Sequence, residues 1–214
     1  MESEMEINHS SVPVRLFQSD FLEFFTHVHP VVVLVIWIPY ALAMLYWGAA
    51  LRPAGTGPLY LAGCFLVGML IWTFAEYNIH RFFFHFDPKT DWQERIVFLF
   101  HGIHHLQPRL KTRLVMPPAA SIPMGAVFYA LFYFTAGRLL GNPHWVGPLL
   151  AGFTVGYLIY DMMHYATHHF PMRRGRVWRY LKRHHVMHHY KTPNARFGVS
   201  TPFWDWVYGT LPKD

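Results

Sequence analysis

Residues 31–51, VVVLVIWIPYALAMLYWGAAL, decide the fold class, because none of them carries a charged side chain. At roughly 1.5 Å of rise per residue, a helix of this length crosses the roughly 30 Å of hydrocarbon in a bilayer. Three more apolar segments of comparable length follow, at residues 58–79, 114–137 and 140–163. Only short connections separate the first segment from the second and the third from the fourth. The sequence therefore predicts an all-α integral membrane protein whose four transmembrane helices form two hairpins.

The composition agrees with a membrane protein. Of the 214 residues, 53% are hydrophobic and only 14% are charged, which is a low share of charge for a soluble domain. A soluble all-α protein with four buried core helices is the alternative, but the remaining residues supply too little polar surface to cover such helices. We expect a single membrane domain over residues 1–214, capped by residues 80–113 and 164–214.

Two simple features narrow the class of protein further. The single cysteine, Cys64, lies inside an apolar run, which excludes an intramolecular disulfide and a cysteine-based metal site. The acidic N-terminal sequence MESEMEINHS is not followed by a short apolar run with a small-residue cleavage site. We therefore expect no secretory signal peptide.

The basic residues predict the orientation in the membrane. Of the 18 Lys and Arg residues, only Arg52 and Arg138 fall in the two short connections. By the positive-inside rule, both termini and the 80–113 loop face the cytoplasm, in the endoplasmic reticulum of a eukaryote or the inner membrane of a bacterium. The net charge of +6 is explained by anionic lipid headgroups or by an acidic protein partner. No nucleic-acid-binding motif is found, so we expect no nucleic-acid partner.

Twelve of the 16 histidines gather in four short motifs on this same predicted side. The motifs are HRFFFH (His80, His85), HGIHH (His101, His104, His105), HYATHH (His164, His168, His169) and HHVMHH (His184, His185, His188, His189). Because helical residues i, i+3 and i+4 share a face, we expect the histidines of HGIHH to point one way, and likewise His185 with His188 and His189, and His164 with His168. The i, i+5 spacing of His80 and His85 does not share an α-helical face. That pair is expected to straddle a helix end or to bind different metals.

Neutral imidazole is a common ligand for Zn, Fe, Cu and Ni, and one such metal accepts at most about six ligands. The number of histidines therefore favours two metals. A proton-sensing histidine cluster and a membrane metal carrier are the alternatives, but a carrier would place ligands along a path through the bilayer midplane. Glu76 and Asp161 lie next to these motifs, and we expect them to accept hydrogen bonds from the second nitrogen of ligating histidines, or else simply to mark the membrane interface.

The four motifs, taken in order, resemble those of the membrane fatty acid hydroxylase and sterol desaturase superfamily. The flanking sequences IWTFAEYNIHRFFFH, YDMMHYATHH, HHVMHHYK and FGVSTPFWDWVYGTLP are more narrowly similar to fatty acid 2-hydroxylases. The resemblance runs from about Arg15 to Pro212. It implies a four-helix membrane bundle whose cytoplasmic cap holds two metals through ten histidines: His80, His85, His101, His104, His105, His164, His168, His185, His188 and His189. His169 and His184 are left over, as residues that support the ligands or face the substrate.

The resemblance also implies a reaction. It is the O₂-dependent 2-hydroxylation of the acyl chain of a sphingolipid, a ceramide or a fatty acid in the bilayer, at a histidine-ligated di-iron centre. Zinc has no redox chemistry and would be a non-catalytic substitute. Many relatives carry a fused cytochrome b5-like domain, for which we find no haem motif here. A separate electron donor, such as a cytochrome b5 or a ferredoxin-type protein, is therefore expected. A related histidine-rich oxidase acting on a sterol, carotenoid or alkyl lipid remains the alternative within enzymes.

Overall fold

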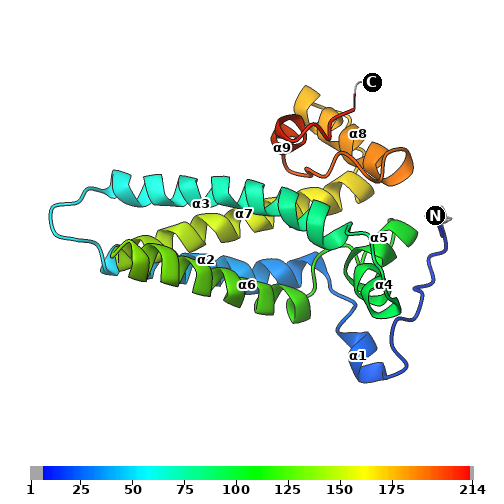
Figure 1. The fold of residues 1–214 in the computed structure, drawn as a ribbon, viewed down its shortest axis with the longest axis horizontal. Coiled ribbons are helices and arrows are strands. Elements are labelled where there is room, and N and C mark those ends of the chain that lie inside the picture. The colour runs from blue at the N-terminus through cyan, green and yellow to red at the C-terminus, as the bar shows by residue number, and fades with distance from the viewer. Residues whose placement is uncertain (1–6, 213–214) are drawn as a thin grey trace.

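The computed structural model describes residues 7–212, and all regular structure in this range is helical. Residues 1–6, on which the expectation of no signal peptide partly rests, lie outside the described part. Four long helices run side by side (Figure 1), and all four are long and apolar enough to cross a membrane. They are α2 (Pro30–Ala50), α3 (Pro58–Asn78), α6 (Pro118–Phe132) and α7 (Pro143–His169).

The boundaries of these helices follow from local chemistry. Each long helix begins with a proline, which has no N–H to leave unpaired in the first turn. The third helix begins at Pro118 rather than at residue 114, because Pro117 before it is extended, as residues before a proline prefer to be. Two of the long helices continue as π-helices, α3 as η1 (Ile79–Phe84) and α6 as η3 (Tyr133–Leu139).

Helix α7 is the centre of the bundle. It packs along both α2 and α3, whereas α2 and α3 make few contacts with each other although they form a hairpin. In its most apolar window 83% of the residues are buried, against 11–22% for the other three long helices. The outer faces of α2, α3 and α6 are thus the apolar surface available to lipid. The sequence predicted the two connections correctly but could not indicate that α7 lies between α2 and α3.

Two glycines of α7 allow this close packing. A Cβ atom on Gly152 would lie 1.9 Å from the carbonyl oxygen of Phe65 in α3, and one on Gly147 would lie 2.3 Å from that of Met44 in α2. Such positions bring helix backbones together, which membrane helices use for van der Waals packing.

We expect Gly152→Ala to destabilise the bundle by about 1–3 kcal/mol, because the added methyl group must push α3 away from α7. The gain in helix propensity from alanine does not compensate for this overlap. Thermal unfolding of the purified protein in detergent measures the effect. Gly63→Ala is the matched control, because a Cβ atom at Gly63 in α3 meets nothing within 4 Å. Equal melting temperatures for the two variants would contradict the packing argument.

The shorter helices form a cap at the end of the bundle opposite the α2–α3 and α6–α7 connections (Figure 1). They are α1 (Asp20–Phe24), α4 (Asp91–Val97), η2 (Phe98–Gly102), α5 (Ile103–Leu106), α8 (Arg176–Tyr190) and α9 (Phe203–Val207). Helix α7 reaches into this cap, since it ends at His169 rather than at residue 163. The same helix therefore both crosses the bundle and presents His164 and His168 to the cap.

A buried arginine ties the N-terminal segment to the cap. The guanidinium of Arg113 donates hydrogen bonds to the Val14 carbonyl and to the Glu23 carboxylate, and it lies 2.9 Å from Nε2 of His27. Glu23 in turn accepts the backbone N–H groups of Leu16 and Phe17, both at 2.9 Å. These contacts hold the segment that contains α1 against the loop before α6.

Candidate metal centre

The ten histidines of the predicted ligand set meet in the cap as two groups of five. Within each group, one ring nitrogen of every histidine lies within 4.8 Å of those of the others. Cluster one consists of His80, His85, His101, His105 and His188, and cluster two consists of His104, His164, His168, His185 and His189. The rings of His105 in cluster one and His189 in cluster two stack with centroids 4.1 Å apart. The two clusters are therefore immediate neighbours.

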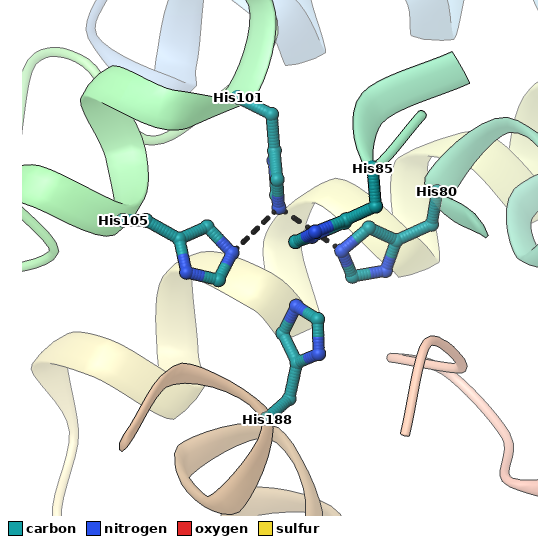
Figure 2. Close-up of side chains that lie close together, drawn as sticks. All are labelled: His80, His85, His101, His105 and His188. Atoms are coloured by element: carbon teal, nitrogen blue, oxygen red, sulfur yellow. Dashed lines mark hydrogen bonds between the residues drawn. The ribbon is translucent and has the colours of Figure 1, made fainter. Parts of the chain in front are cut away.

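Cluster one is formed by the end of the second membrane helix, the η2–α5 segment and α8. Figure 2 shows its five rings turned toward a common centre. Nε2 of His101 lies 3.0 Å from Nε2 of His80 and 2.9 Å from Nε2 of His105. His80, His101 and His188 are almost completely buried.

The π-helix η1 explains why His80 and His85 belong to the same cluster. Hydrogen bonds in a π-helix run from residue i to residue i+5, so residues five apart come to lie one turn above each other. His80 lies inside η1 and His85 ends it. The expectation that this pair straddles a helix end is confirmed. The alternative, that the two residues face different metal sites, is wrong, because the α-helical period on which it was based does not apply here.

Cluster two is formed by α7, α5 and α8. Nε2 of His104 lies 2.8 Å from that of His164 and 3.0 Å from that of His189. Nε2 of His185 lies 2.8 Å from that of His168 and 3.0 Å from that of His189. His164 and His168 point the same way, as their i, i+4 spacing predicted.

The two HxxHH motifs do not each point one way, which corrects the sequence prediction. In HGIHH, His101 and His105 belong to cluster one, whereas His104 belongs to cluster two. In HHVMHH the assignment is reversed, because His185 and His189 belong to cluster two and His188 to cluster one. Each motif thus gives its i, i+4 pair to one cluster and its i+3 residue to the other. This division is possible because, seen down the helix axis, residues i+3 and i+4 are rotated to opposite sides of residue i.

Burial keeps these imidazoles neutral. It lowers the pKa of His85 to about 2, with further lowering by His188 and His105. Burial also lowers the pKa of His188 to about 4, although its hydrogen bond to Ala195 acts in the opposite direction. In cluster two, burial holds the pKa values of His104 and His185 well below the ordinary value. At neutral pH the clusters therefore offer unprotonated nitrogen lone pairs rather than positive charge.

Hydrogen bonds fix which nitrogen carries the lone pair in two residues of cluster one. A carbonyl oxygen can only accept, so Nδ1–H of His188 must donate to the Ala195 carbonyl at 2.8 Å, and Nδ1–H of His80 must donate to the Phe197 carbonyl. The Nε2 atoms of both rings are then unprotonated and face the cluster. Such converging buried lone pairs are stabilised by a Lewis acid. A donor set of imidazole nitrogens alone suits Fe, Zn, Cu or Ni and not Mg or Ca, so the residues fit two transition-metal ions.

The predicted supporting carboxylates have other partners. Glu76 accepts hydrogen bonds from the backbone N–H groups of Val199 and Ser200. Asp161 accepts from the Met116 N–H at 3.2 Å and the Tyr157 hydroxyl at 3.3 Å. The prediction that Glu76 and Asp161 accept directly from ligating histidines is therefore wrong. Glu76 accepts from backbone N–H groups and the Ser200 hydroxyl, and Asp161 accepts from a backbone N–H group and the Tyr157 hydroxyl.

The two left-over histidines lie outside both clusters. His169 is half-buried at the end of α7, with its ring 4.5 Å from that of Tyr165. His184 is fully buried, and its Nε2 lies 3.2 Å from the carboxylate of Asp205. Asp205 was missed in the sequence. Its signal was available, because it is the first acidic residue after Asp161, in a segment that carries eight basic residues.

An apolar cavity of about 310 Å³ borders both clusters. His101 of cluster one and His104 and His164 of cluster two contribute to its wall. The N-terminal segment also lines the cavity, through Leu16, Phe17, Leu22 and Phe25. Further lining residues include Phe84, Leu114, Val115, Ala119 and Ala120. Its size and lining suit part of a hydrocarbon chain.

Comparison with known proteins agrees with this architecture. Residues 65–210 match the family model described as fatty acid hydroxylase. A dihydroceramide fatty acyl 2-hydroxylase of Arabidopsis thaliana is 35% identical over 92% of this chain and 80% of its own length. A ceramide very long chain fatty acid hydroxylase of Saccharomyces cerevisiae is 38% identical over 89% of this chain, which spans only 48% of the yeast protein.

Likeness to a solved structure points the same way. The structure of full-length scs7p, in which only the hydroxylase domain is visible, is 36% identical in sequence and superposes with a TM-score of 0.80. The match covers 91% of this chain and 70% of that one. The fold, the histidine motifs and the sequence similarity agree, and the chain is a member of the fatty acid hydroxylase family.

Proposed function

We propose that the protein is a di-iron fatty acid 2-hydroxylase, which uses O₂ to hydroxylate C2 of the acyl chain of a ceramide, another sphingolipid or a fatty acid. The observation that carries this proposal is the apolar cavity whose wall contains histidines of both clusters. A chain bound in this cavity lies beside both candidate metal sites. The names of the relatives supply the reaction class and the type of lipid.

The ten histidines would hold the two ions, five nitrogens to each. When bound, a redox-active pair such as iron supplies the chemistry that a C–H bond next to a carbonyl carbon requires: with two electrons and two protons, one atom of O₂ enters the C–H bond and the other leaves as water. The protein's own part is to position the reactants. Phe84 and Tyr160 line the cavity near the histidines, and the apolar walls orient the acyl chain and exclude water.

The sidedness of the protein is part of the proposal. Both clusters lie in the cap, which forms one end of the bundle (Figure 1). All the basic residues between 7 and 212 except Arg52 and Arg138 lie outside the two short connections at the other end. By the positive-inside rule the end that carries the cap faces the cytoplasm. Electrons would then reach the metal centre from a cytoplasmic donor, such as a cytochrome b5 or a ferredoxin-type protein.

The outer face of α8 is the surface we propose for this donor. Between Asp161 and Asp205 the chain has no acidic residue and eight basic ones. Arg176 and Arg179 are exposed on α8, the helix whose inner face carries His185, His188 and His189. An acidic donor surface bound here would contact the helix that carries histidines of both clusters, and complementary charge would speed the encounter.

We expect the double variant Arg176→Glu, Arg179→Glu to raise the KM for an acidic donor protein about tenfold at low ionic strength, with the difference shrinking in high salt. Steady-state hydroxylation at varied donor concentration measures it. Arg138→Glu, at the opposite end of the bundle, should leave the KM unchanged. A double variant with the wild-type KM for the donor would remove α8 as the docking surface.

The proposal as a whole is tested by expressing the chain in a host that lacks its own 2-hydroxylase and analysing its lipids by mass spectrometry. The proposal predicts acyl chains one oxygen heavier in the ceramide or fatty acid fraction, and about two iron ions for each purified chain. If hydroxylated products are found among sterols, carotenoids or alkyl lipids instead, the substrate class is wrong. If the chain binds metal, receives electrons and oxidises no lipid, a metal carrier becomes the better account.

A further inference from the structure

Residues 195–200, here called the 195–200 loop, run along cluster one. The carbonyls of Ala195 and Phe197 accept the Nδ1–H groups of His188 and His80. Between them lies Arg196, a buried residue whose φ is 62°. This left-handed conformation turns the chain so that the carbonyls on either side of Arg196 both meet histidines of cluster one.

A left-handed conformation is unfavourable for a residue other than glycine and persists only where surrounding contacts impose it. Arg196 itself is held by its backbone N–H, which donates to the Thr210 carbonyl at 3.0 Å. The four residues that follow it are held by two buried carboxylates, which accept their four consecutive backbone N–H groups. Asp205 accepts from Phe197 and Gly198, each at 2.8 Å. Glu76 accepts with a single oxygen, Oε1, from Val199 at 2.7 Å and Ser200 at 2.8 Å.

Each carboxylate is itself anchored in the fold. Glu76 belongs to the membrane helix α3, and its second oxygen accepts the Ser200 hydroxyl. Asp205 belongs to α9 and also contacts Nε2 of His184 at 3.2 Å and the Thr210 hydroxyl at 2.8 Å. The loop is thus pinned between an α3 side chain and an α9 side chain.

Gly198 permits the tight fit of the loop against Asp205. A Cβ atom there would lie 2.1 Å from the Thr201 carbonyl oxygen and 2.9 Å from Oδ2 of Asp205. A larger residue would have to move the loop, and with it the carbonyls of Ala195 and Phe197. The position of these carbonyls is therefore set by backbone packing as well as by the two carboxylates.

Three of the five histidines in cluster two have no equivalent support in the part of the chain that the structure describes. The Nδ1 atoms of His104, His185 and His189 are buried and have no hydrogen-bond partner among residues 7–212. The 195–200 loop therefore distinguishes the two clusters, because its carbonyls fix the ring orientation and tautomer of His80 and His188 in cluster one, whereas these three histidines of cluster two have no such contact.

We propose that Glu76 and Asp205 are positioning residues for the metal of cluster one. They hold the 195–200 loop so that its carbonyls keep His80 and His188 in the tautomer whose Nε2 lone pair faces the metal. Groups that orient a ligating histidine typically contribute 10- to 100-fold to metal affinity. We call the hydrogen bonds from Glu76 and Asp205 to the 195–200 loop the clamp. Loss of the clamp should therefore release the metal of cluster one and spare that of cluster two. The inference rests on the proposed metal centre.

Asp205→Asn is the direct test. Its amide would present N–H groups where Oδ2 now accepts from Gly198, so one end of the loop is released while side-chain volume is kept. We expect the metal content of the purified full-length protein, measured by elemental mass spectrometry, to fall from about two ions to about one. After loading with Co²⁺, the absorption spectrum should match that of His101→Ala, which lacks a cluster-one nitrogen, and differ from that of His185→Ala, which lacks one from cluster two.

A pair of variants at Glu76 tests the other end of the loop. Glu76→Gln keeps an oxygen that can accept both the Val199 and Ser200 N–H groups, and its amide can donate to the Ser200 hydroxyl. It should retain both metals. Glu76→Ala removes the acceptor and should lose the cluster-one metal. This pair decides the question if Asp205→Asn does not yield folded protein.

The outcomes distinguish a failure of the clamp from a failure of the proposed metal centre. Two metals and an unchanged Co²⁺ spectrum in both Asp205→Asn and Glu76→Ala would overturn the clamp and leave the proposed function standing. Loss of both metals from either variant, with the fold retained, would also overturn it, because the effect would not be confined to cluster one. A wild-type chain that binds no metal would remove the proposed function and this inference together.

Discussion

Alanine in place of His101 or of His185 is expected to lower 2-hydroxylation by more than about 100-fold, although each residue belongs to only one cluster. Loss of a group that merely orients a metal ligand costs 10- to 100-fold, so loss of the ligand itself should cost more. Each variant should keep the metal of the intact cluster. Activity should be lost in both, because the proposed chemistry needs both ions.

The measurement is paired: metal content and the rate of product formation with saturating donor and lipid. His144→Ala is the matched control, since His144 lies at the first turn of α7, far from both clusters, with its ring 5.4 Å from that of Tyr60. It should keep two metals and normal activity. If His101→Ala hydroxylated at the wild-type rate, the ten-histidine assignment would be wrong.

Removal and replacement of the metal ions should also have a large effect on activity and melting temperature. Removal of the ions by a chelator should abolish activity and lower the melting temperature by about 5–10 °C, because ions bound only to the folded state stabilise it by a few kcal/mol. Adding Fe²⁺ should restore both properties. Adding Zn²⁺ should restore the melting temperature alone, because zinc satisfies the imidazole lone pairs but has no redox chemistry.

Thermal unfolding and hydroxylation assays on the chelated, iron-loaded and zinc-loaded protein provide this comparison. Full activity with zinc would contradict a redox mechanism. A melting temperature that does not respond to either ion would contradict metal binding by the buried clusters.

Much of the fold could be predicted from the sequence, because crossing a bilayer imposes a simple requirement of length and apolarity. The four runs and the short connections at Arg52 and Arg138 sufficed for the all-α membrane bundle. The central position of α7 could not be predicted in the same way. It depends on Gly147 and Gly152 meeting the backbones of α2 and α3, and a glycine in an apolar helix does not reveal which helix it faces.

The candidate site was predictable in its members and not in its arrangement. The histidine motifs and their resemblance to a known family were enough to select the ten residues that the structure brings together. The division into clusters was not, because His80 and His85 were read with an α-helical period and the i+3 and i+4 residues of each HxxHH motif were placed on one face. The π-helix η1 brings His85 beside His80, and the i+3 residues His104 and His188 cross to the other cluster.

The supporting contacts were the least predictable part. Glu76 was singled out from its place at the end of an apolar run, but its hydrogen-bond partners are 123 and 124 residues away in the chain. Such partners depend on how the C-terminal segment folds back on α3. Asp205, in a short helix between aromatic residues, was noticed only in the structure.

The central claim is tested most directly by supplying ¹⁸O₂ to the purified, iron-loaded protein with its electron donor and a ceramide or fatty acid, and locating the label by fragmentation mass spectrometry. The account predicts one ¹⁸O atom at C2 of the acyl chain, and none in a parallel reaction with His101→Ala. Oxygen that comes from water, or label at another carbon, would contradict it.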